Sequence, residues 1–211
     1  MHQHDQLSII YQDDDFIAVD KPSGLLCVPG LREPDNLHDR VKTTFANARV
    51  VHRLDMSTSG IVLFALHHEA QKRIGKLFEQ RLMRKHYVAI VDGVLGQQQG
   101  EVHSRLICDW PNRPKQKVDW LNGKHASTYY SVISRDEEKN NTRVGLKPIT
   151  GRTHQLRVHM HQLGHPILGD KLYNQNHSET KHERLTLHAE YLSFAHPFEG
   201  TPITIQSRAK F

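Results

Sequence analysis

The sequence predicts an α+β fold in which a mixed, mainly antiparallel sheet is flanked by a few helices. Short apolar or alternating segments recur along the chain, and the polar or glycine-containing turns between them are typical of hairpins. Only two segments show the spacing of a helix. The 211 residues contain no obvious polar linker, so we expect a single domain over residues 1–211.

The chain begins with a predicted hairpin. Residues 7–11 and 16–19 alternate as strands around a turn of three aspartates, and Lys21-Pro22-Ser23-Gly24 ends the second strand. The apolar run 60–66 predicts a buried strand. An amphipathic helix is expected over residues 67–82, with basic residues opposite an apolar stripe of Ala70, Ile74, Leu77 and Phe78.

The remainder of the chain predicts further strands and a second helix. Residues 137–141 are the clearest turn, and residues 153–163 form a helix that Gly164 and Pro166 terminate. The expected strands cover residues 87–94, 101–107, 128–134, 143–148, 185–194 and 202–206.

Composition excludes several classes of protein. Cys27 and Cys108 lie too far apart in sequence to suggest a disulfide framework, so a reducing cytosol is the expected compartment. The polar N-terminus lacks the features of a secretory signal. No apolar run approaches the roughly 20 residues of a membrane helix. We therefore expect a cytoplasmic protein with no membrane segment.

Positive charge is concentrated after residue 50. The first 50 residues hold five of the 28 Lys and Arg but eight of the 23 Asp and Glu, which leaves a net charge of +8 for the remainder. Clusters of cations suit phosphate binding, because each neutralised phosphate releases a condensed counterion. They also suit an ordinary solvated surface. The charge alone leaves both interpretations open.

Residues 51–60 (Val-His-Arg-Leu-Asp-Met-Ser-Thr-Ser-Gly) place a carboxylate beside a guanidinium on a loop that enters a buried strand. The short side chains after Asp55 can fix this loop by local hydrogen bonds, and loops fixed by a sheet often carry catalytic groups. The same spacing fits an aspartate that caps a turn, with Arg53 in a surface ion pair.

Residues 150–159 contain a strand that ends at Gly151 and a helix that follows it. Arg152 at this junction can turn inward and pair with a carboxylate, holding it ionised and oriented. An ordinary helix N-terminus with an exposed arginine is the alternative.

Together the two segments resemble signature motifs of the RluA family of pseudouridine synthases. The family pattern His-Arg-Leu-Asp-x-x-Thr-Ser-Gly is met by residues 52–60, and Gly-Arg-Thr-His-Gln-Leu-Arg by residues 151–157. Residues 21–24, 85–87 and 164–170 match further family elements in the expected order. The resemblance covers most of the chain and implies the pseudouridine synthase catalytic fold.

The resemblance also implies roles for single residues. Asp55 corresponds to the catalytic aspartate, Arg152 to the arginine that pairs with it, and Tyr87 to the aromatic residue that stacks on the target uracil. Arg53 corresponds to the side chain that fills the gap left by the flipped nucleotide, and Leu156 to an apolar residue at the pocket floor. The expected scaffold of the active-site loop comprises His52, Thr58 and residues 21–24.

The implied reaction needs no cofactor, because uridine and pseudouridine have the same atoms and oxidation state. The enzyme must cut the N1–C1′ bond, retain the uracil while it turns, and join C5 to C1′, which calls for a carboxylate, a closed pocket and base flipping. Whether Asp55 attacks C1′, adds to C6 or deprotonates C2′ stays open, as does the base that removes the C5 proton.

Among the 17 histidines, four crowd around the second predicted helix: His154, His159, His161 and His165. The last two have the spacing that places ligands on one helical face. Because no glutamate of a His-Glu-x-x-His motif and no nearby cysteine pair completes the set, we expect no metal site.

The substrate is inferred from residues 106–118, which resemble the corresponding stretch of the family's small dual-specificity member. Arg113, Lys115 and Lys117 in this stretch are expected to bind RNA, although a basic loop with nonspecific phosphate contacts has the same composition. The implied substrates are one uridine in the tRNA anticodon loop and one in 23S ribosomal RNA.

With no separate S4 RNA-binding domain expected, substrate choice would reside in the catalytic domain, and no obligate protein partner is implied. The alternatives are a family member that modifies a single RNA site, a noncatalytic RNA-binding protein on the same fold, and a uridine-directed glycosylase or hydrolase.

Overall fold

The N-terminal hairpin forms as predicted. In the computed structural model, β1 (Ile9–Gln12) pairs antiparallel with β2 (Phe16–Lys21). The Asp13 carboxylate caps the turn by accepting hydrogen bonds of 2.8 Å from the backbone N–H groups of Asp15 and Phe16. The structure describes residues 7–30, 33–174 and 182–211.

The chain divides into two compact units, one of residues 1–85 and 189–210 and the other of residues 86–188 and 211. The expectation of a single domain therefore stays a prediction. No helix in the described ranges has the length and hydropathy needed to cross a bilayer.

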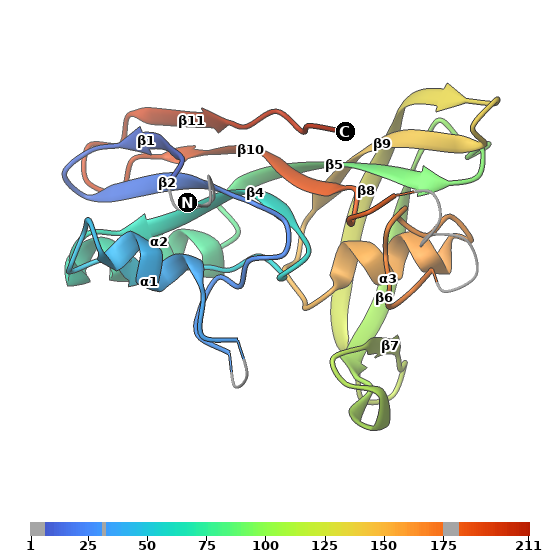
Figure 1. The fold of residues 1–211 in the computed structure, drawn as a ribbon, viewed down its shortest axis with the longest axis horizontal. Coiled ribbons are helices and arrows are strands. Elements are labelled where there is room, and N and C mark those ends of the chain that lie inside the picture. Colours follow the sequence, from blue (N-terminus) through green and yellow to red (C-terminus); the bar gives the residue numbers. More distant parts are fainter. Residues whose placement is uncertain (1–6, 31–32, 175–181) are drawn as a thin grey trace. The chain divides into compact units, whose positions relative to one another are not determined.

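The first unit is a sheet in the order β1-β2-β4-β10-β11, with β3 also paired to β4. Every residue of β4 is buried, as its unbroken apolar run predicts. Ala70 and Ile74 of α2 pack against the sheet, and Figure 1 shows α1 and α2 on the same face of it. The elements are α1 (Leu37–Lys42), β3 (Arg49–Val50), β4 (Ser59–Ala65), α2 (His68–Glu79), β10 (Leu187–Ala195) and β11 (Pro202–Gln206), besides the hairpin.

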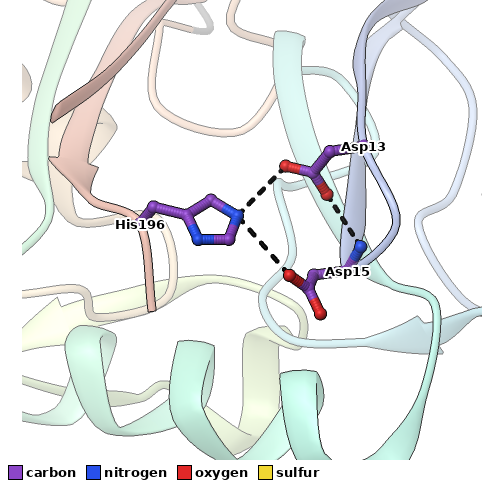
Figure 2. A group of neighbouring side chains, drawn as sticks. All are labelled: Asp13, Asp15 and His196. Atoms are coloured by element: carbon purple, nitrogen blue, oxygen red, sulfur yellow. Dashed lines mark hydrogen bonds and ion pairs between the residues drawn. The ribbon is translucent and has the colours of Figure 1, made fainter. Parts of the chain in front are cut away.

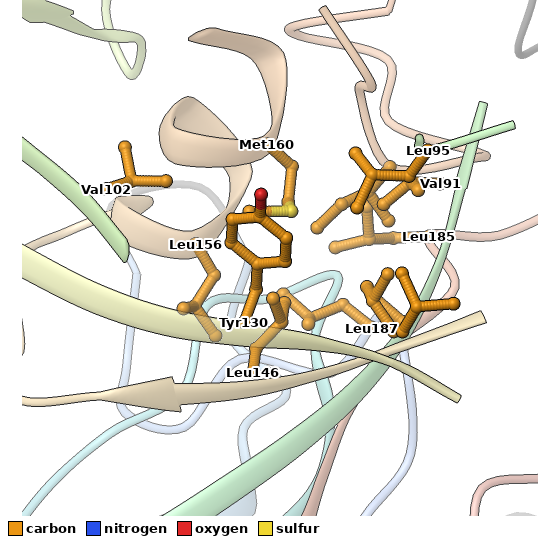
Figure 3. Packing of buried hydrophobic residues seen from close by; sticks show 13 residues of the cluster. Val91, Leu95, Val102, Tyr130, Leu146, Leu156, Met160, Leu185 and Leu187 are labelled. Atoms are coloured by element: carbon orange, nitrogen blue, oxygen red, sulfur yellow. The ribbon is translucent and has the colours of Figure 1, made fainter. Parts of the chain in front are cut away.

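The second unit is an antiparallel sheet in the order β5-β9-β8-β6-β7. One face is covered by α3, whose Leu156 and Met160 enter a buried apolar cluster with Tyr130 and Leu146 of the sheet (Figure 3). The elements are β5 (Arg84–Asp92), β6 (Gln99–Cys108), a 3-10 turn (Trp110–Asn112), β7 (Gln116–Val118), β8 (Lys124–Asp136), β9 (Asn141–Pro148) and α3 (Gln155–Gln162).

The predicted fold class is confirmed, and each predicted strand and helix is present within a few residues of its expected limits. Within the described residues, four short elements were not predicted: α1, β3, the 3-10 turn and β7. The expectation that His161 and His165 lie on one helical face is wrong. Because α3 ends at Gln162, His165 lies beyond the helix and does not share a helical face with His161.

Candidate functional site

The loop that carries Asp55 joins β3 to β4 in the first unit. Asp55 is half-buried, and its carbonyl accepts a hydrogen bond of 3.1 Å from the Thr58 N–H, which closes a turn immediately after it. The preceding residue, Leu54, is buried, and its N–H donates to the Cys27 sulfur at 3.2 Å. The backbone is therefore fixed on both sides of the carboxylate, whereas Arg53 is exposed.

Lys21, the last residue of β2, and the segment that follows it hold the same loop. The fully buried Lys21 ammonium donates to the carbonyl oxygens of Leu25 at 2.7 Å and of Pro22 and Met56 at 2.9 Å. A second anchor is the Ser23 hydroxyl, which donates to the Ser57 carbonyl at 2.6 Å. This segment is thus the scaffold that the sequence predicts, and it fastens the two residues that follow Asp55.

His52 fixes the loop to the adjoining strand. Its Nε2 accepts a hydrogen bond of 2.9 Å from the backbone N–H of Leu63 in β4, and its ring contacts Phe78 with centroids 4.6 Å apart. Burial, aided by the nearby Lys85 charge, lowers the pKa of His52 to about 3. The imidazole is therefore neutral at physiological pH, as an acceptor must be.

Gly60, which ends the motif, lies where no side chain fits. Its φ is +111°, and a Cβ atom would stand 2.3 Å from the carbonyl oxygen of Ala189 in β10. Only glycine permits this backbone conformation together with so close an approach of two strands.

In the second unit, Gln155 organises the junction between β9 and α3. Its side-chain oxygen accepts from the Thr150 hydroxyl at 2.7 Å and from the Arg152 N–H at 3.0 Å, and its side-chain nitrogen donates to Ser127 O and Thr128 Oγ1 at 3.0 Å. The buried amide thus ties the start of α3 to β8 and sets the backbone from which Arg152 projects.

The Arg152 side chain is exposed, and its Nε donates to the carbonyl oxygen of His125 at 3.0 Å. That contact fixes the base of the guanidinium against β8. Its pairing with Asp55, which belongs to the first unit, stays a prediction.

A buried ion pair holds the other end of this motif. Arg157 donates from Nε and Nη2 to the two carboxylate oxygens of Asp170, both at 2.7 Å, and the two side chains are 4% and 0% exposed. Asp170 also accepts from the N–H groups of Leu172 and Tyr173. The bidentate geometry and the additional donors compensate for burying both charges. This pair joins α3 to Asp170, the last residue of the segment 164–170 that resembles a family element.

Tyr87 and Leu156 meet the same apolar cluster. Tyr87, on β5 opposite Leu146, is half-buried against it, and Leu156 is a buried member (Figure 3). Both side chains thus belong to or pack against one apolar cluster, and their predicted roles as stacking ring and pocket floor stay predictions. Of the three predicted RNA-binding cations, Arg113 and Lys117 are exposed and Lys115 is half-buried, all at the β6–β7 connection.

Three of the four histidines near α3 form hydrogen bonds of 2.8–2.9 Å: His154 with the Tyr173 hydroxyl, His159 with two hydroxyls and His165 with a backbone carbonyl. The His161 ring lies beside the same tyrosine, with centroids 6.2 Å apart. Burial lowers the pKa of His159 to about 4, with His103 and His125 contributing, so this imidazole is a neutral link between α3 and the sheet.

Two carboxylates and an imidazole meet in the first unit with a separation that would suit a cation (Figure 2). His196 Nε2 lies 3.2 Å from Asp13 and 3.6 Å from Asp15, and His67 binds the second oxygen of Asp15 at 2.8 Å. Asp13 further accepts from the Tyr11 hydroxyl at 2.8 Å. Burial, reinforced by this hydrogen bond, raises the pKa of Tyr11 to about 12. We interpret the group as a polar network that fastens the hairpin turn to the end of β10.

Comparisons with known proteins identify the family of this chain. The family model described as RNA pseudouridylate synthase matches residues 15–162. The dual-specificity RNA pseudouridine synthase RluA of Yersinia pestis is 50% identical over 96% of this chain and 99% of its own length. That of Escherichia coli K12 is 48% identical over 99% of this chain and 96% of its own.

Among solved structures, human RNA Pseudouridylate Synthase Domain Containing 1 superposes with a TM-score of 0.85 at 28% identity, covering 100% of this chain and 86% of that one. The range matched by the family model spans Asp55, Tyr87 and Arg152, and the sequence similarity runs through both units. The chain belongs to the RNA pseudouridylate synthase family, within its RluA group.

Proposed function

We propose that this chain converts uridine to pseudouridine at two sites, uridine 32 in the tRNA anticodon loop and uridine 746 in 23S ribosomal RNA. The observation that carries this proposal is the similarity to dual-specificity RluA proteins along nearly the whole chain. Both RNAs are cytoplasmic in bacteria, and the two cysteines are free thiols, which suits a reducing cytoplasm. The proposal requires no protein partner and no cofactor.

Asp55 is proposed as the catalytic carboxylate. A group that reacts at the sugar or the base must return to one position in every turnover, and effective positioning contributes several kcal/mol to a rate. Hydrogen bonds from Lys21, Ser23 and Thr58 to the loop backbone support this role, because they fix the position of the main chain that carries Asp55. Arg152 is proposed to pair with this carboxylate and keep it ionised.

Tyr87 and Leu156 are proposed to hold the uracil after its bond to the ribose is cut. A half-buried aromatic ring on a core strand offers a flat face at low entropic cost, and Leu156 supplies an apolar surface from the same cluster. Retention of the base is what separates an isomerase from a glycosylase.

Arg53 is proposed to occupy the space of the flipped nucleotide. Its guanidinium is planar, can stack between bases and can bind phosphate, and its exposure beside Asp55 leaves it free to enter RNA. Arg53→Ala should then slow modification more on a folded stem-loop than on an RNA whose target uridine is held in a bulge. Equal losses on both RNAs would assign Arg53 a bracing role instead.

The test of the function follows tritium released from uracil C5 together with free uracil, using a tRNA anticodon stem-loop and a 23S fragment side by side. A dual-specificity synthase releases tritium from both RNAs and no uracil. Uracil release identifies a glycosylase, tritium from one RNA a single-site enzyme, and binding without either product a noncatalytic protein.

Asp55→Asn should abolish tritium release while leaving RNA affinity within a few-fold, because the carboxylate contributes little to holding phosphates. Turnover above about a thousandth of wild type would remove Asp55 from the catalytic role. Asp39→Asn, which changes an aspartate on α1 outside the motif, is the matched control.

A further inference from the structure

The chain contains two tryptophans, and both lie on one short projection of the second unit, residues 109–123, here named the tryptophan arm. The arm comprises the 3-10 turn, β7 and the turn before β8, and Figure 1 shows β7 at the end of β6, below α3 in this view. Trp110 is 66% exposed and Trp120 is 60% exposed, and Leu121 beside the latter is 87% exposed. Indole rings are usually buried in a monomer, so two exposed ones in one place indicate an interaction surface.

The arm is built as a defined structure. In its first turn, the Asp109 N–H donates to the Lys115 carbonyl at 2.9 Å, and Asn112 donates to both the carbonyl and the carboxylate of Asp109 at 2.9 Å. The Gln116 N–H then donates to the buried Tyr173 hydroxyl at 2.7 Å, which joins β7 to the core.

The second turn is equally constrained. The Asp119 carboxylate accepts from the N–H groups of Leu121 and Asn122 at 3.0 and 2.9 Å. Gly123 crosses the backbone of β6 so closely that a Cβ atom would stand 2.6 Å from the carbonyl oxygen of Arg105. The backbone that carries the two exposed indoles is thus fixed by hydrogen bonds. A base that stacks on them therefore costs little conformational entropy of the protein.

The chemistry of the arm favours a nucleic acid over an apolar protein surface. Its cations are Arg113, Lys115 and Lys117, whereas its two carboxylates are engaged in capping the turns. The Arg113 guanidinium lies 4.4 Å from the centroid of the Trp110 ring, an arrangement that can extend a stack and bind phosphate at once. Aromatic rings interleaved with cations are what unpaired bases and their backbone require.

We propose that Trp110 and Trp120 are stacking platforms for unpaired bases in the loop of the RNA substrate, with Arg113, Lys115 and Lys117 holding the adjoining phosphates. The inference rests on the proposed function for the identity of the RNA. Trp110 lies beyond the Cys108–Gln116 end of the β6–β7 pairing and Trp120 beyond the Leu106–Val118 end, so the two rings contact different nucleotides. The arm thereby selects loops over paired helices.

The test uses the natural fluorescence of the protein, since every indole signal comes from the arm. Asp55→Asn protein is titrated with the anticodon stem-loop and with a fully paired duplex of equal length. We expect the stem-loop to quench the emission strongly and the duplex to quench it weakly. Single-tryptophan versions, made by Trp110→Phe or Trp120→Phe, assign the quenching to each ring while keeping a stacking face.

Affinity is measured in parallel by anisotropy of labelled RNA. Trp110→Ala and Trp120→Ala should each weaken stem-loop binding at least about 5-fold without changing its salt dependence, because stacking displaces no counterions. Lys117→Gln should instead lower the salt slope by about one. Ile133→Ala, which truncates a 56%-exposed side chain on β8, is the matched control and should bind like wild type.

Unquenched emission together with wild-type affinity of both alanine variants would overturn the proposal. The exposed indole rings would then be assigned to an interface with another protein. Equal losses on stem-loop and duplex would overturn the selection of loops. The outcome is independent of catalysis. A chain that binds loop RNA through its tryptophans but forms no pseudouridine keeps this inference and loses the proposed function.

Discussion

Lys21→Met should separate the scaffold of the Asp55 loop from its chemistry. Methionine keeps the length and apolar stem of the buried side chain but removes three hydrogen bonds to the carbonyls of Pro22, Leu25 and Met56. A hydrogen bond from a charged group contributes about 1.5–3 kcal/mol. Methionine also avoids the free-energy cost of burying a charged ammonium group, so the net loss of stability is smaller than the sum of the three hydrogen bonds. We expect a net loss of about 3 kcal/mol in the free energy of unfolding.

The assay is urea unfolding followed by circular dichroism, together with single-turnover modification at a temperature where the variant is folded. With a slope of about 2 kcal/mol per molar, the urea midpoint falls by about 1.5 M. Because Met56 follows Asp55, the rate at saturating RNA should fall roughly 10- to 100-fold, as expected for a displaced reacting group.

Two further variants serve as an intermediate case and a control for the loss of stability and rate. Ser23→Ala removes one hydrogen bond, to the Ser57 carbonyl, and should cost about 1 kcal/mol. Lys72→Met changes an exposed lysine on α2 and should leave both stability and rate unaltered. A Lys21→Met protein within 1 kcal/mol of wild type, with a wild-type rate, would refute the anchoring role.

Four further outcomes are expected. Gly60→Ala should cost roughly 3 kcal/mol or more, because the new methyl group meets the β10 backbone, whereas Gly75→Ala, inside α2 with open space around it, should stabilise the protein by up to about 1 kcal/mol; urea midpoints compare the two. Asp170→Asn leaves Arg157 buried without its full counter-charge and should cost about 3–5 kcal/mol, and a smaller loss than the double replacement of both by leucine would contradict the ion-pair reasoning. His159 has a folded pKa of about 4, below the unfolded value, so its contribution to stability is complete above pH 6.5 and is lost as the pH falls toward 4. His159→Asn should flatten that fall by up to about 1.4 kcal/mol per pH unit, as unfolding across this pH range would show. Activity should persist in excess chelator when monovalent salt maintains the RNA fold, and loss that zinc restores would contradict the metal-free reaction.

Much of the fold could be predicted because its signals are local. The unbroken apolar run of β4 and the apolar stripe of α2 each identify one element without information from elsewhere in the chain. The elements that escaped prediction are too short to show a clear periodic pattern of their own. β7 has three residues and exists through its pairing with β6, and α1 has six residues capped by Asn36.

Asp55 could be proposed for the candidate site from the sequence because its motif residues are assigned by their own chemistry, and its role stays a prediction. Contacts between side chains far apart in the sequence could not be predicted. The Asp13 and His196 side chains are 183 residues apart in sequence, and neither lies in a motif. The partnership of Arg157 with Asp170 joins two recognised motifs, but spacing alone gives no reason to pair those two side chains.

The hydrogen bonds from Lys21 and Ser23 to the Asp55 loop determine which loop positions can vary in sequence. Both anchors bind backbone oxygens, those of Met56 and Ser57, which every amino acid possesses. Met56 is itself 45% exposed. The two hydrogen bonds therefore do not depend on the side chains at positions 56 and 57. These are the two positions that the family pattern leaves unspecified. Residues 56 and 57 can therefore vary without loss of the two hydrogen bonds that hold the backbone next to Asp55.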